Sequence, residues 1–208
     1  MAVYVKKEVI VPDRNLWNGK IFLMNNTNSA LLVMDMQTAV LGRVTDYNNL
    51  IKGVQKAISV ARLRNIPVLY ITVGFRPGMP EVSTQNKVFG ASKARAIQGD
   101  MGELMKIDQQ IAPLENDIII TKKRMSAFTG SDLEVVLRSL GVSHLILSGV
   151  ATSGVVLSTS REAADKDYLI TVLSDACADY DDALHSVLVE KVLPMQAEVI
   201  TVAHWEES

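Results

Sequence analysis

Polar residues that follow apolar runs are the first candidates for chemistry in this chain. Asp35 comes directly after ALLVM, Lys122 follows IIIT, Asp175 lies just beyond LITVL, and a further apolar run continues into GVAT at 149–152. Open α/β sheets bind ligands beyond the carboxyl ends of their strands. If the apolar runs are parallel strands, these positions converge on one rim of the sheet.

Asp35 is the strongest candidate for a catalytic group. A carboxyl group at the edge of an apolar sheet is partly desolvated, and desolvation raises its pKa. The alternative is a structural aspartate that caps a helix or shapes a turn. Its position directly after a continuous apolar run favours the catalytic interpretation.

Lys122 begins a basic trio with Lys123 and Arg124. Alternate side chains of a strand face opposite sides, so Lys122 and Arg124 would share a direction and Lys123 would oppose them. One of these cations could neutralise Asp35 or bind an anionic substrate. A solvated basic loop is the competing interpretation.

The segment Gly149-Val-Ala-Thr-Ser-Gly154 joins an apolar run to a predicted helix. Backbone N–H groups at a helix N-terminus can hold an anion or a developing oxyanion. The two glycines permit tight backbone geometry. Alternatively, Thr152 or Ser153 simply caps the helix.

Other reactive side chains give weaker signals. Cys177 is the only cysteine, and a single cysteine is more often a small buried apolar residue than a nucleophile. His144, His185 and His204 lie outside any obvious active-site motif, so a histidine base for Cys177 or a serine has no support. The sequence contains neither a clustered metal-binding pattern nor a glycine-rich phosphate loop, and we expect no metal and no cofactor.

The elements that would position these residues alternate between strands and helices. The predicted strands are Ala30–Met34, Val68–Val73, Ile118–Thr121, His144–Ser148, Leu169–Leu173 and Val199–Val202. The predicted helices cover 47–61, 101–111, the stretch from a capping box at Ser131–Glu134 to a stop at Gly141, 153–165, and 182–193. This alternation predicts a three-layer α/β/α fold with a six-stranded, mainly parallel sheet.

Composition favours one globular domain spanning residues 1–208. The 208 residues are 48% hydrophobic and 21% charged, and the formal net charge of −2 gives no electrostatic footprint for nucleic acid. Residues 1–28 read as an irregular N-terminal arm that Trp17 and Phe22 could pack onto the body or onto a partner subunit. No apolar run reaches the roughly 18 residues of a membrane span, no signal peptide is evident, and a disulfide within the chain is impossible. We therefore expect a cytoplasmic protein.

Three segments together resemble the isochorismatase-like, or cysteine-hydrolase, superfamily. They are ALLVMDMQ, TKKRMSAFTGSDLEVVL and LILSGVATSGVVLSTSREAADKDYLITVLSDACAD, and their spacing holds from about Ala30 to Val202. The resemblance maps the family's aspartate to Asp35 and its lysine to Lys122. It also implies a parallel six-stranded sheet and a cis peptide at Val150–Ala151. The oxyanion-binding turn would then comprise Val150, Ala151, Thr152, Ser153 and Gly154.

Val155 is where this chain departs from the family's amidases, which use an Asp–Lys–Cys triad. Nicotinamidase-like members read GVATDYCV where this chain reads GVATSGVV, so Val155 takes the place of the nucleophilic cysteine. Valine offers no nucleophile, which removes the thioester route. The paired histidines of metal-binding nicotinamidases are also missing from VGFRPGMPE.

Isochorismatases provide a reaction that needs no cysteine. They hydrolyse a vinyl ether and release pyruvate, and a carboxylic acid can deliver the required proton to carbon. The resemblance therefore implies a hydrolase in which Asp35 is the general acid and Lys122 assists. Gln37, Arg76, Arg124 and Phe128 are candidate residues for binding an anionic small-molecule substrate.

Two other functions remain open. The chain could be a small-molecule binding protein on a retired enzyme scaffold, or an amidase that recruits Cys177 or a serine. The resemblance also implies a homo-oligomer, either a dimer or a tetramer. We expect no nucleic-acid partner and no membrane partner.

Overall fold

The computed structural model describes residues 28–96 and 105–208. The predicted arm at 1–28, including Trp17 and Phe22, lies outside the described residues except for its last residue. No helix in the described ranges is long and apolar enough to cross a membrane.

A six-stranded sheet forms the centre of the molecule, and all of its strand pairs are parallel. The strands are β1 (Ser29–Met34), β2 (Val68–Val73), β3 (Ile118–Lys122), β4 (His144–Val150), β5 (Leu169–Ala178) and β6 (Glu198–Ile200). Their order is β3-β2-β1-β4-β5-β6. The chain adds β2 and β3 on one side of β1, and it then adds β4, β5 and β6 on the other side. The strand order therefore reverses between β1 and β4, where ligands bind in folds of this type.

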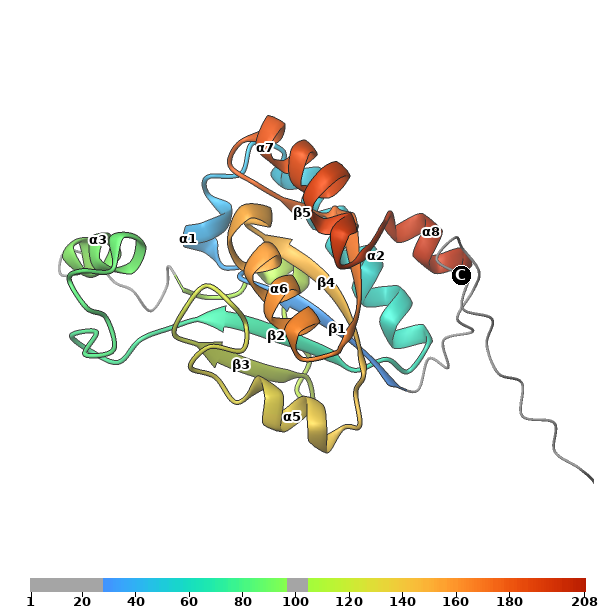
Figure 1. Cartoon of the computed structure of the whole chain (residues 1–208), viewed down its shortest axis with the longest axis horizontal. Coiled ribbons are helices and arrows are strands. Elements are labelled where there is room, and N and C mark those ends of the chain that lie inside the picture. Colours follow the sequence, from blue (N-terminus) through green and yellow to red (C-terminus); the bar gives the residue numbers. More distant parts are fainter. Residues whose placement is uncertain (1–27, 97–104) are drawn as a thin grey trace, which may run out of the picture.

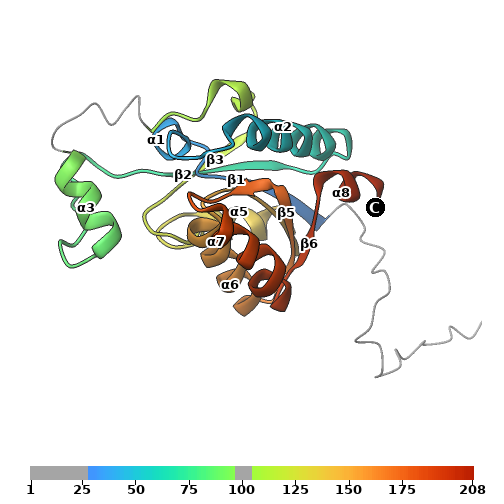
Figure 2. The ribbon, with the colours of Figure 1, turned by 90° about the horizontal axis from the view of Figure 1, so that it is seen from above.

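Helices cover both faces of the sheet (Figure 1; Figure 2). The helices are α1 (Thr38–Leu41), α2 (Tyr47–Leu63), α3 (Lys87–Ala96), α5 (Leu133–Ser139), α6 (Leu157–Asp165), α7 (Asp182–Val187) and α8 (Val202–Glu207). Shorter turns are η2 (Gln109–Ile111), η3 (Thr152–Val156), η4 (Leu188–Val192) and η5 (Leu193–Met195). Figure 2 shows α1 and α2 above the sheet and α5, α6 and α7 below it. The predicted three-layer α/β/α class is confirmed.

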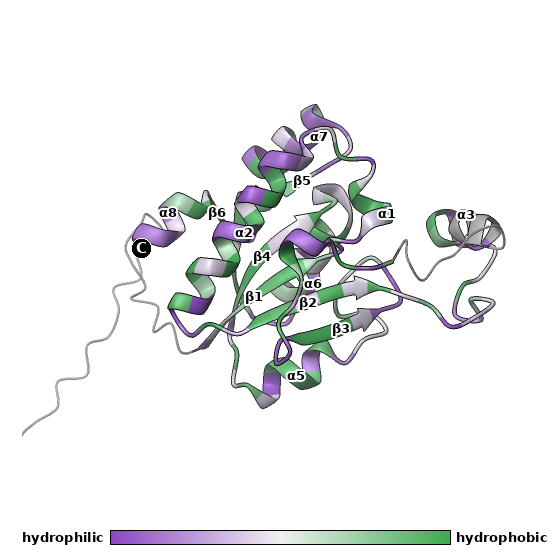
Figure 3. Ribbon diagram, turned by 180° about the vertical axis from the view of Figure 1, so that it is seen from behind, coloured by the Kyte–Doolittle hydropathy of each residue, from purple (hydrophilic) through white to green (hydrophobic). Residues whose placement is uncertain are grey.

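The core has two parts because side chains alternate along each strand. Leu31 and Val33 of β1 pack with α2 and α8 on one face, while Leu32 and Met34 pack with α5 and α6 on the other. β1 is buried at every position, as its uninterrupted apolar sequence predicts. The apolar strands appear as green ribbon between the helices in Figure 3.

Several predicted boundaries were wrong. In the described part of the predicted 101–111 helix, only the short turn η2 is helical. The predicted 182–193 helix divides into α7 and the wider turn η4, followed by η5 with Pro194 in its first turn. Three helices were missed: the single turn α1, α8, which Thr201 caps by accepting from the His204 N–H, and α3, which projects from the body in Figure 1.

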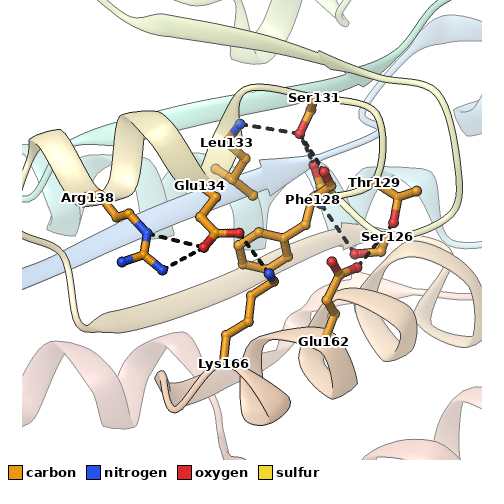
Figure 4. A network of polar contacts seen from close by, with 10 residues as sticks. Ser126, Phe128, Thr129, Ser131, Leu133, Glu134, Arg138, Glu162 and Lys166 are labelled. Atoms are coloured by element: carbon orange, nitrogen blue, oxygen red, sulfur yellow. Dashed lines mark hydrogen bonds and ion pairs between the residues drawn. The ribbon is translucent and has the colours of Figure 1, made fainter.

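The capping box predicted at Ser131–Glu134 is absent, although α5 does end just before Gly141. The Ser131 hydroxyl donates to the carbonyl oxygens of Ala127 and Phe128 and accepts from the Leu133 N–H at 3.3 Å. The Glu134 carboxylate binds Arg138 and Lys166 instead, each at 2.7 Å (Figure 4). Lys166, the residue at the C-terminal end of α6, has replaced the local cap as the partner of Glu134, and it ties α5 to α6.

Candidate active site

Asp35 and Lys122 form a buried ion pair at the carboxyl edge of the sheet. Asp35 follows β1 and Lys122 ends β3, and the lysine reaches past β2 to place its Nζ 2.9 Å from Asp35 Oδ2. The Lys122 side chain is 1% exposed and that of Asp35 is 10% exposed. Lys122 Nζ also donates to the Arg124 carbonyl oxygen at 2.9 Å. The structure therefore brings together the two residues predicted to do the chemistry.

Local backbone geometry aims the Asp35 carboxyl group at the rim. Asp35 has a φ of +51°, a left-handed conformation that aspartate adopts more readily than most residues. Its N–H donates to the Ile71 carbonyl oxygen of β2 at 2.8 Å, which fixes the end of β1. The extended backbone of β1 therefore ends directly before this residue.

The two oxygens of Asp35 have different surroundings. Oδ2 accepts from Lys122, whereas Oδ1 is buried and has no hydrogen-bond partner among the described residues. Burial raises the pKa of Asp35 to about 6, although the charge and hydrogen bond of Lys122 act in the opposite direction. A carboxyl group of this kind can hold a proton near neutral pH and has an oxygen available to deliver it.

Gln37 lies next to this pair but its amide is bound to backbone. Its Nε2 donates to the carbonyl oxygens of Val73 and Met105, and its Oε1 accepts from the Val73 N–H at 2.9 Å. Both amide hydrogens are therefore used. The structure places Gln37 as a clamp between the ends of β1 and β2, and its predicted contact with substrate stays a prediction.

Arg76 and Arg124 are joined through one residue of the loop after β2. Arg76 binds the Glu81 carboxylate at 2.7 Å and its side chain is 72% exposed. Arg124 donates to the carbonyl oxygens of Lys123 and Glu81. These contacts bring the two arginines to Glu81, and no hydrogen bond or ion pair joins either guanidinium to Asp35 within the described residues.

Phe128 packs in the core beside α5 and α6. Its ring lies 5.9 Å from that of Tyr168 and 5.5 Å from Lys166 Nζ. Figure 4 shows the lysine side chain beside this ring. These contacts position the segment after β3. They give the ring a packing role, while its predicted role in substrate binding stays a prediction.

The turn after β4 lies directly beside Asp35. Met34 of β1 pairs with Gly149 of β4, and the peptide bond Val150–Ala151 that follows is cis, as the family resemblance implied. Gly149 has a φ of +127°, and a Cβ at this position would collide with the Met34 carbonyl oxygen. Only glycine permits this close approach of β4 to β1.

Part of the predicted oxyanion turn is already occupied by protein acceptors. The Ser153 N–H donates to Asp179 Oδ2 at 2.6 Å, and the Gly154 N–H donates to the Ala151 carbonyl oxygen at 3.0 Å. The hydroxyl of Thr152 is paired with His185 Nδ1 at 2.8 Å. Val155, in the turn η3, is 1% exposed and packs in the apolar core below the sheet.

Two residues at the end of β5 differ from expectation. β5 continues beyond the predicted Leu173 to Ala178, so Asp175 does not end it. Asp175 is exposed and caps α8 by accepting from the Val202 N–H at 2.7 Å. Cys177 is buried, and burial raises the pKa of its thiol to about 12. Cys177 therefore lacks the accessible thiolate that a nucleophile requires.

Sequence reasoning missed Asp179, Tyr180, His185 and Arg43. Asp179 and His185 bind the turn, and the Arg43 guanidinium lies 4.0 Å from the centroid of the Tyr180 ring. Burial raises the pKa of Tyr180, and the nearby carboxylates of Asp35 and Asp179 raise it further. The only local signal for Asp179 is its position directly after β5. Because β5 was predicted to end at Leu173 and in fact ends at Ala178, that signal was missed.

No metal site is apparent in residues 28–96 and 105–208, because these ranges contain no group of three or more His, Cys, Asp or Glu side chains that could hold an ion.

Comparisons with known proteins identify the family of this chain. The isochorismatase domain family matches residues 29–204. The isochorismatase family protein YwoC of Bacillus subtilis is 25% identical over 177 residues, which cover 83% of this chain and 92% of YwoC. The ureidoacrylate amidohydrolase RutB of Pseudomonas syringae is 30% identical over 175 residues, covering 74% of this chain and 71% of RutB.

Solved structures share the fold. A cysteine hydrolase from Pseudomonas syringae pv. phaseolicola superimposes with a TM-score of 0.80 at 22% identity, covering 88% of this chain and 93% of that one. N-carbamoylsarcosine amidase from Thermoplasma acidophilum gives a TM-score of 0.66 at 23% identity, covering 84% and 96% of the two chains.

Proposed function

Because this chain belongs to the isochorismatase family of hydrolases, we propose that it hydrolyses an enol ether by general acid catalysis, without a covalent intermediate. Isochorismate is the substrate that we propose to test first. Asp35 is the proposed acid, and Lys122 is the proposed partner that orients it. Val155 lies where a nucleophile would otherwise be expected.

The observation that carries this proposal is Oδ1 of Asp35, which has no hydrogen-bond partner in residues 28–96 and 105–208. It is buried beside an oxygen held by Lys122, on a carboxyl group whose pKa is raised to about 6 by burial. At pH 7 roughly a tenth of such a group is protonated, which is enough for a general acid that works near neutral pH.

The reaction begins when Asp35 transfers its proton to the terminal carbon of the enol ether. The electron pair of the C=C bond forms the new C–H bond, and the ether-bearing carbon becomes an oxocarbenium ion. A water oxygen then bonds to that carbon and gives a hemiketal. As the water attacks, it gives one proton to Asp35, which is thereby restored. The bond from the hemiketal carbon to the ether oxygen then breaks with its electron pair on the departing oxygen, and that oxygen receives the hydroxyl proton of the hemiketal as the C=O bond forms. The products are an alcohol and, from isochorismate, pyruvate.

The test is pyruvate release from isochorismate, followed by lactate dehydrogenase and the loss of NADH absorbance. We expect turnover by the unmodified chain and a loss of at least about 100-fold in kcat for Asp35→Asn, which cannot donate the proton. Asp165→Asn, an exposed aspartate of α6, is the matched control and should keep full activity.

Two results would contradict the proposal. Pyruvate at the uncatalysed rate with the unmodified chain rules out isochorismate as a substrate. Full activity in Asp35→Asn rules out its role as the acid, whatever the substrate.

Amide hydrolysis is the second candidate, and the 30% identity to the ureidoacrylate amidohydrolase RutB favours it. In this case water would have to attack the carbonyl directly, because Cys177 is buried and Val155 has no nucleophilic atom. Consumption of ureidoacrylate that persists in Cys177→Ala and is lost in Asp35→Asn would support it. The absence of ureidoacrylate consumption would remove that substrate.

The proposal also includes an anionic substrate, a dimer or tetramer, and a cytoplasmic location. Light scattering of the full chain measures the assembly, and cell fractionation measures the location. A monomer at micromolar concentration would contradict the proposed dimer or tetramer. Recovery outside the cytoplasmic fraction would contradict the proposed location.

A further inference from the structure

A cavity of about 300 Å³ lies between α2, β2 and the turn η2. Helix α2 lies above the sheet in Figure 2. Tyr70 of β2 lines the cavity and packs in the part of the core that faces α2. Lys122 lies two positions after Ile120, which packs in the part that faces α5 and α6, so Lys122 leaves β3 on the other face. The cavity and the lysine of the candidate active site therefore lie on opposite faces of the sheet.

The Tyr70 hydroxyl is a buried polar group without a partner in the wall of this cavity. Tyr70 is 1% exposed, and its hydroxyl has no hydrogen-bond partner in residues 28–96 and 105–208. Burial raises the pKa of Tyr70 and the nearby Arg62 guanidinium opposes this, but no hydrogen bond of ordinary length and angle joins the two groups. A buried polar group without a partner costs free energy in the folded chain, and a missing ligand is one explanation for it.

Two glutamine side chains add hydrogen-bond acceptors to the cavity. Gln55 Nε2 donates to the Gln110 carbonyl oxygen at 2.9 Å, and Gln110 Nε2 donates to the Tyr47 hydroxyl at 2.8 Å. These bonds hold both amides in place, and neither Oε1 atom accepts a hydrogen bond from the part of the chain that the structure describes. The cavity therefore offers a donor at Tyr70 and acceptors at the two glutamines.

Charge and apolar surface narrow the class of ligand further. Arg62 is the one charged residue among the described residues that line the cavity, and Asp117 already pairs with it at 2.7 Å. This pair leaves no uncompensated charge to attract an ion. Ile58 and Ile111 line the same cavity, and both are buried apolar residues. Apolar walls with a few placed polar groups are typical of sites for small organic molecules.

We propose that this cavity binds a small neutral molecule that carries an amide-like group on an apolar body. Its carbonyl oxygen accepts from the Tyr70 hydroxyl, and its N–H groups donate to the Oε1 atoms of Gln55 and Gln110. The apolar body packs against the two isoleucines. The Arg62 side chain, which is 37% exposed, shifts to admit the ligand oxygen to the buried hydroxyl. This binding is independent of the reaction proposed above.

The first experiment uses benzamide, a neutral amide on an apolar ring, added to the ¹⁵N-labelled full chain. We expect saturable NMR shifts of the side-chain amide signals of Gln55 and Gln110, with a Kd on the order of 1 mM for so small a ligand. The absence of saturable shifts up to about 10 mM would overturn the proposal. Shifts confined to residues around Asp35 would also overturn it, because they would place benzamide in the candidate active site.

Two further probes test the chemical class. Benzoate has the shape of benzamide but carries a negative charge and no N–H group, and toluene has only the apolar body. The negative charge of Asp117 already acts on Tyr70 and opposes a second anion there. Both probes should bind at least about fivefold more weakly than benzamide. Benzoate or toluene binding as tightly as benzamide would overturn the assignment to neutral amides.

The second experiment removes the hydroxyl alone. Tyr70→Phe should be at least as stable as the unmodified chain in urea unfolding, because the lost group has no partner in the empty cavity. It should bind benzamide about threefold to tenfold more weakly, which corresponds to one hydrogen bond. An unchanged Kd would overturn the proposal, and so would a clear loss of stability, since that would mean that the hydroxyl is already bonded within the chain.

Tyr168→Phe is the matched control, because Tyr168 packs on the opposite face of the sheet. Its Kd for benzamide should equal that of the unmodified chain. Gln55→Ala tests an acceptor at an exposed position of α2, where the core is left intact, and it should also weaken benzamide binding. An unchanged Kd in Gln55→Ala would contradict the proposed contact with this glutamine.

Discussion

At the scale of single residues, the Asp35–Lys122 pair sets two opposing effects against each other. A neighbouring cation lowers the pKa of a carboxyl group, and burial raises it. In this structure burial has the larger effect, and the pKa of Asp35 is about 6. The Asp35 carboxyl group therefore holds its proton up to a higher pH than an exposed aspartate does, as a general acid requires.

The pH dependence of activity should report this group. If protonated Asp35 is the active form, kcat/KM should be nearly constant below about pH 5.5 and fall about tenfold for each pH unit well above 6. The measurement is pyruvate release from isochorismate between pH 5 and 9, with the coupling enzyme in excess at each pH. A constant kcat/KM up to pH 8 would contradict the assignment of Asp35 as the acid.

Breaking the ion pair should be costly. Lys122→Met fills the same space but leaves the Asp35 carboxylate buried and unpaired, so the free energy of unfolding at pH 8 should fall by about 3–5 kcal/mol. The double variant Asp35→Asn/Lys122→Met carries no buried charge at this position and should regain most of that loss. Urea unfolding of the four proteins of this cycle measures the coupling.

The matched condition for this cycle is pH 4.5, below the pKa of about 6, where folded Asp35 is mostly protonated. There the Lys122→Met variant should lose less stability than at pH 8, since a neutral carboxyl group needs no counter-ion. An equal loss at both pH values would mean that Lys122 acts mainly through packing.

At the scale of elements, an irregularity in β5 decides which aspartate reaches the site. Leu147 of β4 pairs with Val172, yet Gly149 pairs with Cys177, so β5 has extra residues between two pairings. This bulge pushes Asp175 out to cap α8 and delivers Asp179 to the turn. A strand that paired regularly would have placed a different side chain there.

Gly53 of α2 packs against the backbone of this bulge. A Cβ on Gly53 would overlap the Asp175 carbonyl oxygen, so α2 can pack against β5 only with glycine at this position. Gly53→Ala should therefore lower the free energy of unfolding by about 1–3 kcal/mol through overpacking, although alanine alone favours helix by about 1 kcal/mol. Urea unfolding gives this value.

Lys52→Ala is the matched control for this substitution, because its side chain is exposed on the same turn of α2. It should change stability by less than about 0.5 kcal/mol. A Gly53→Ala variant more stable than the unmodified chain would show that β5 moves away at little cost.

At the scale of the whole molecule, His144 ties three strands together. It begins β4, its Nδ1 is 2.9 Å from the Ser29 hydroxyl of β1, and its Nε2 is 3.0 Å from the Thr171 hydroxyl of β5. Burial lowers the pKa of His144 from 6.5 to about 4. The folded chain therefore keeps this histidine neutral through a pH range in which the unfolded chain protonates it.

The consequence is a loss of stability in acid. Because the pKa of folded His144 is lowered, its contribution is present above about pH 6.5 and declines as the pH falls toward 4, by up to about 3 kcal/mol. His144→Asn should be less stable than the unmodified chain at pH 7, and this difference should shrink at pH 4.5. The exposed His204→Asn provides the control. A difference independent of pH would contradict the neutral state of His144.

The sequence by itself determined the strands, the three-layer class and the two chemical groups at the rim. Continuous apolar runs such as Ala30–Met34 specify strands buried on both faces, and the polar residues directly after them must lie at the strand ends. Asp35 and Lys122 could therefore be named, and Val155 could be placed in the turn from the order of motifs. These features depend on residues close together in the chain.

Only the tertiary structure decided what each of these residues contacts. The free Oδ1 of Asp35, the clamp made by Gln37, and the choice of Asp179 over Asp175 all result from contacts between distant segments. Such contacts depend on register, on a bulge in one strand, and on how much water is removed around each group. Tertiary packing determines the register, the bulge and the removal of water. None of these can be predicted from a local pattern of residue types.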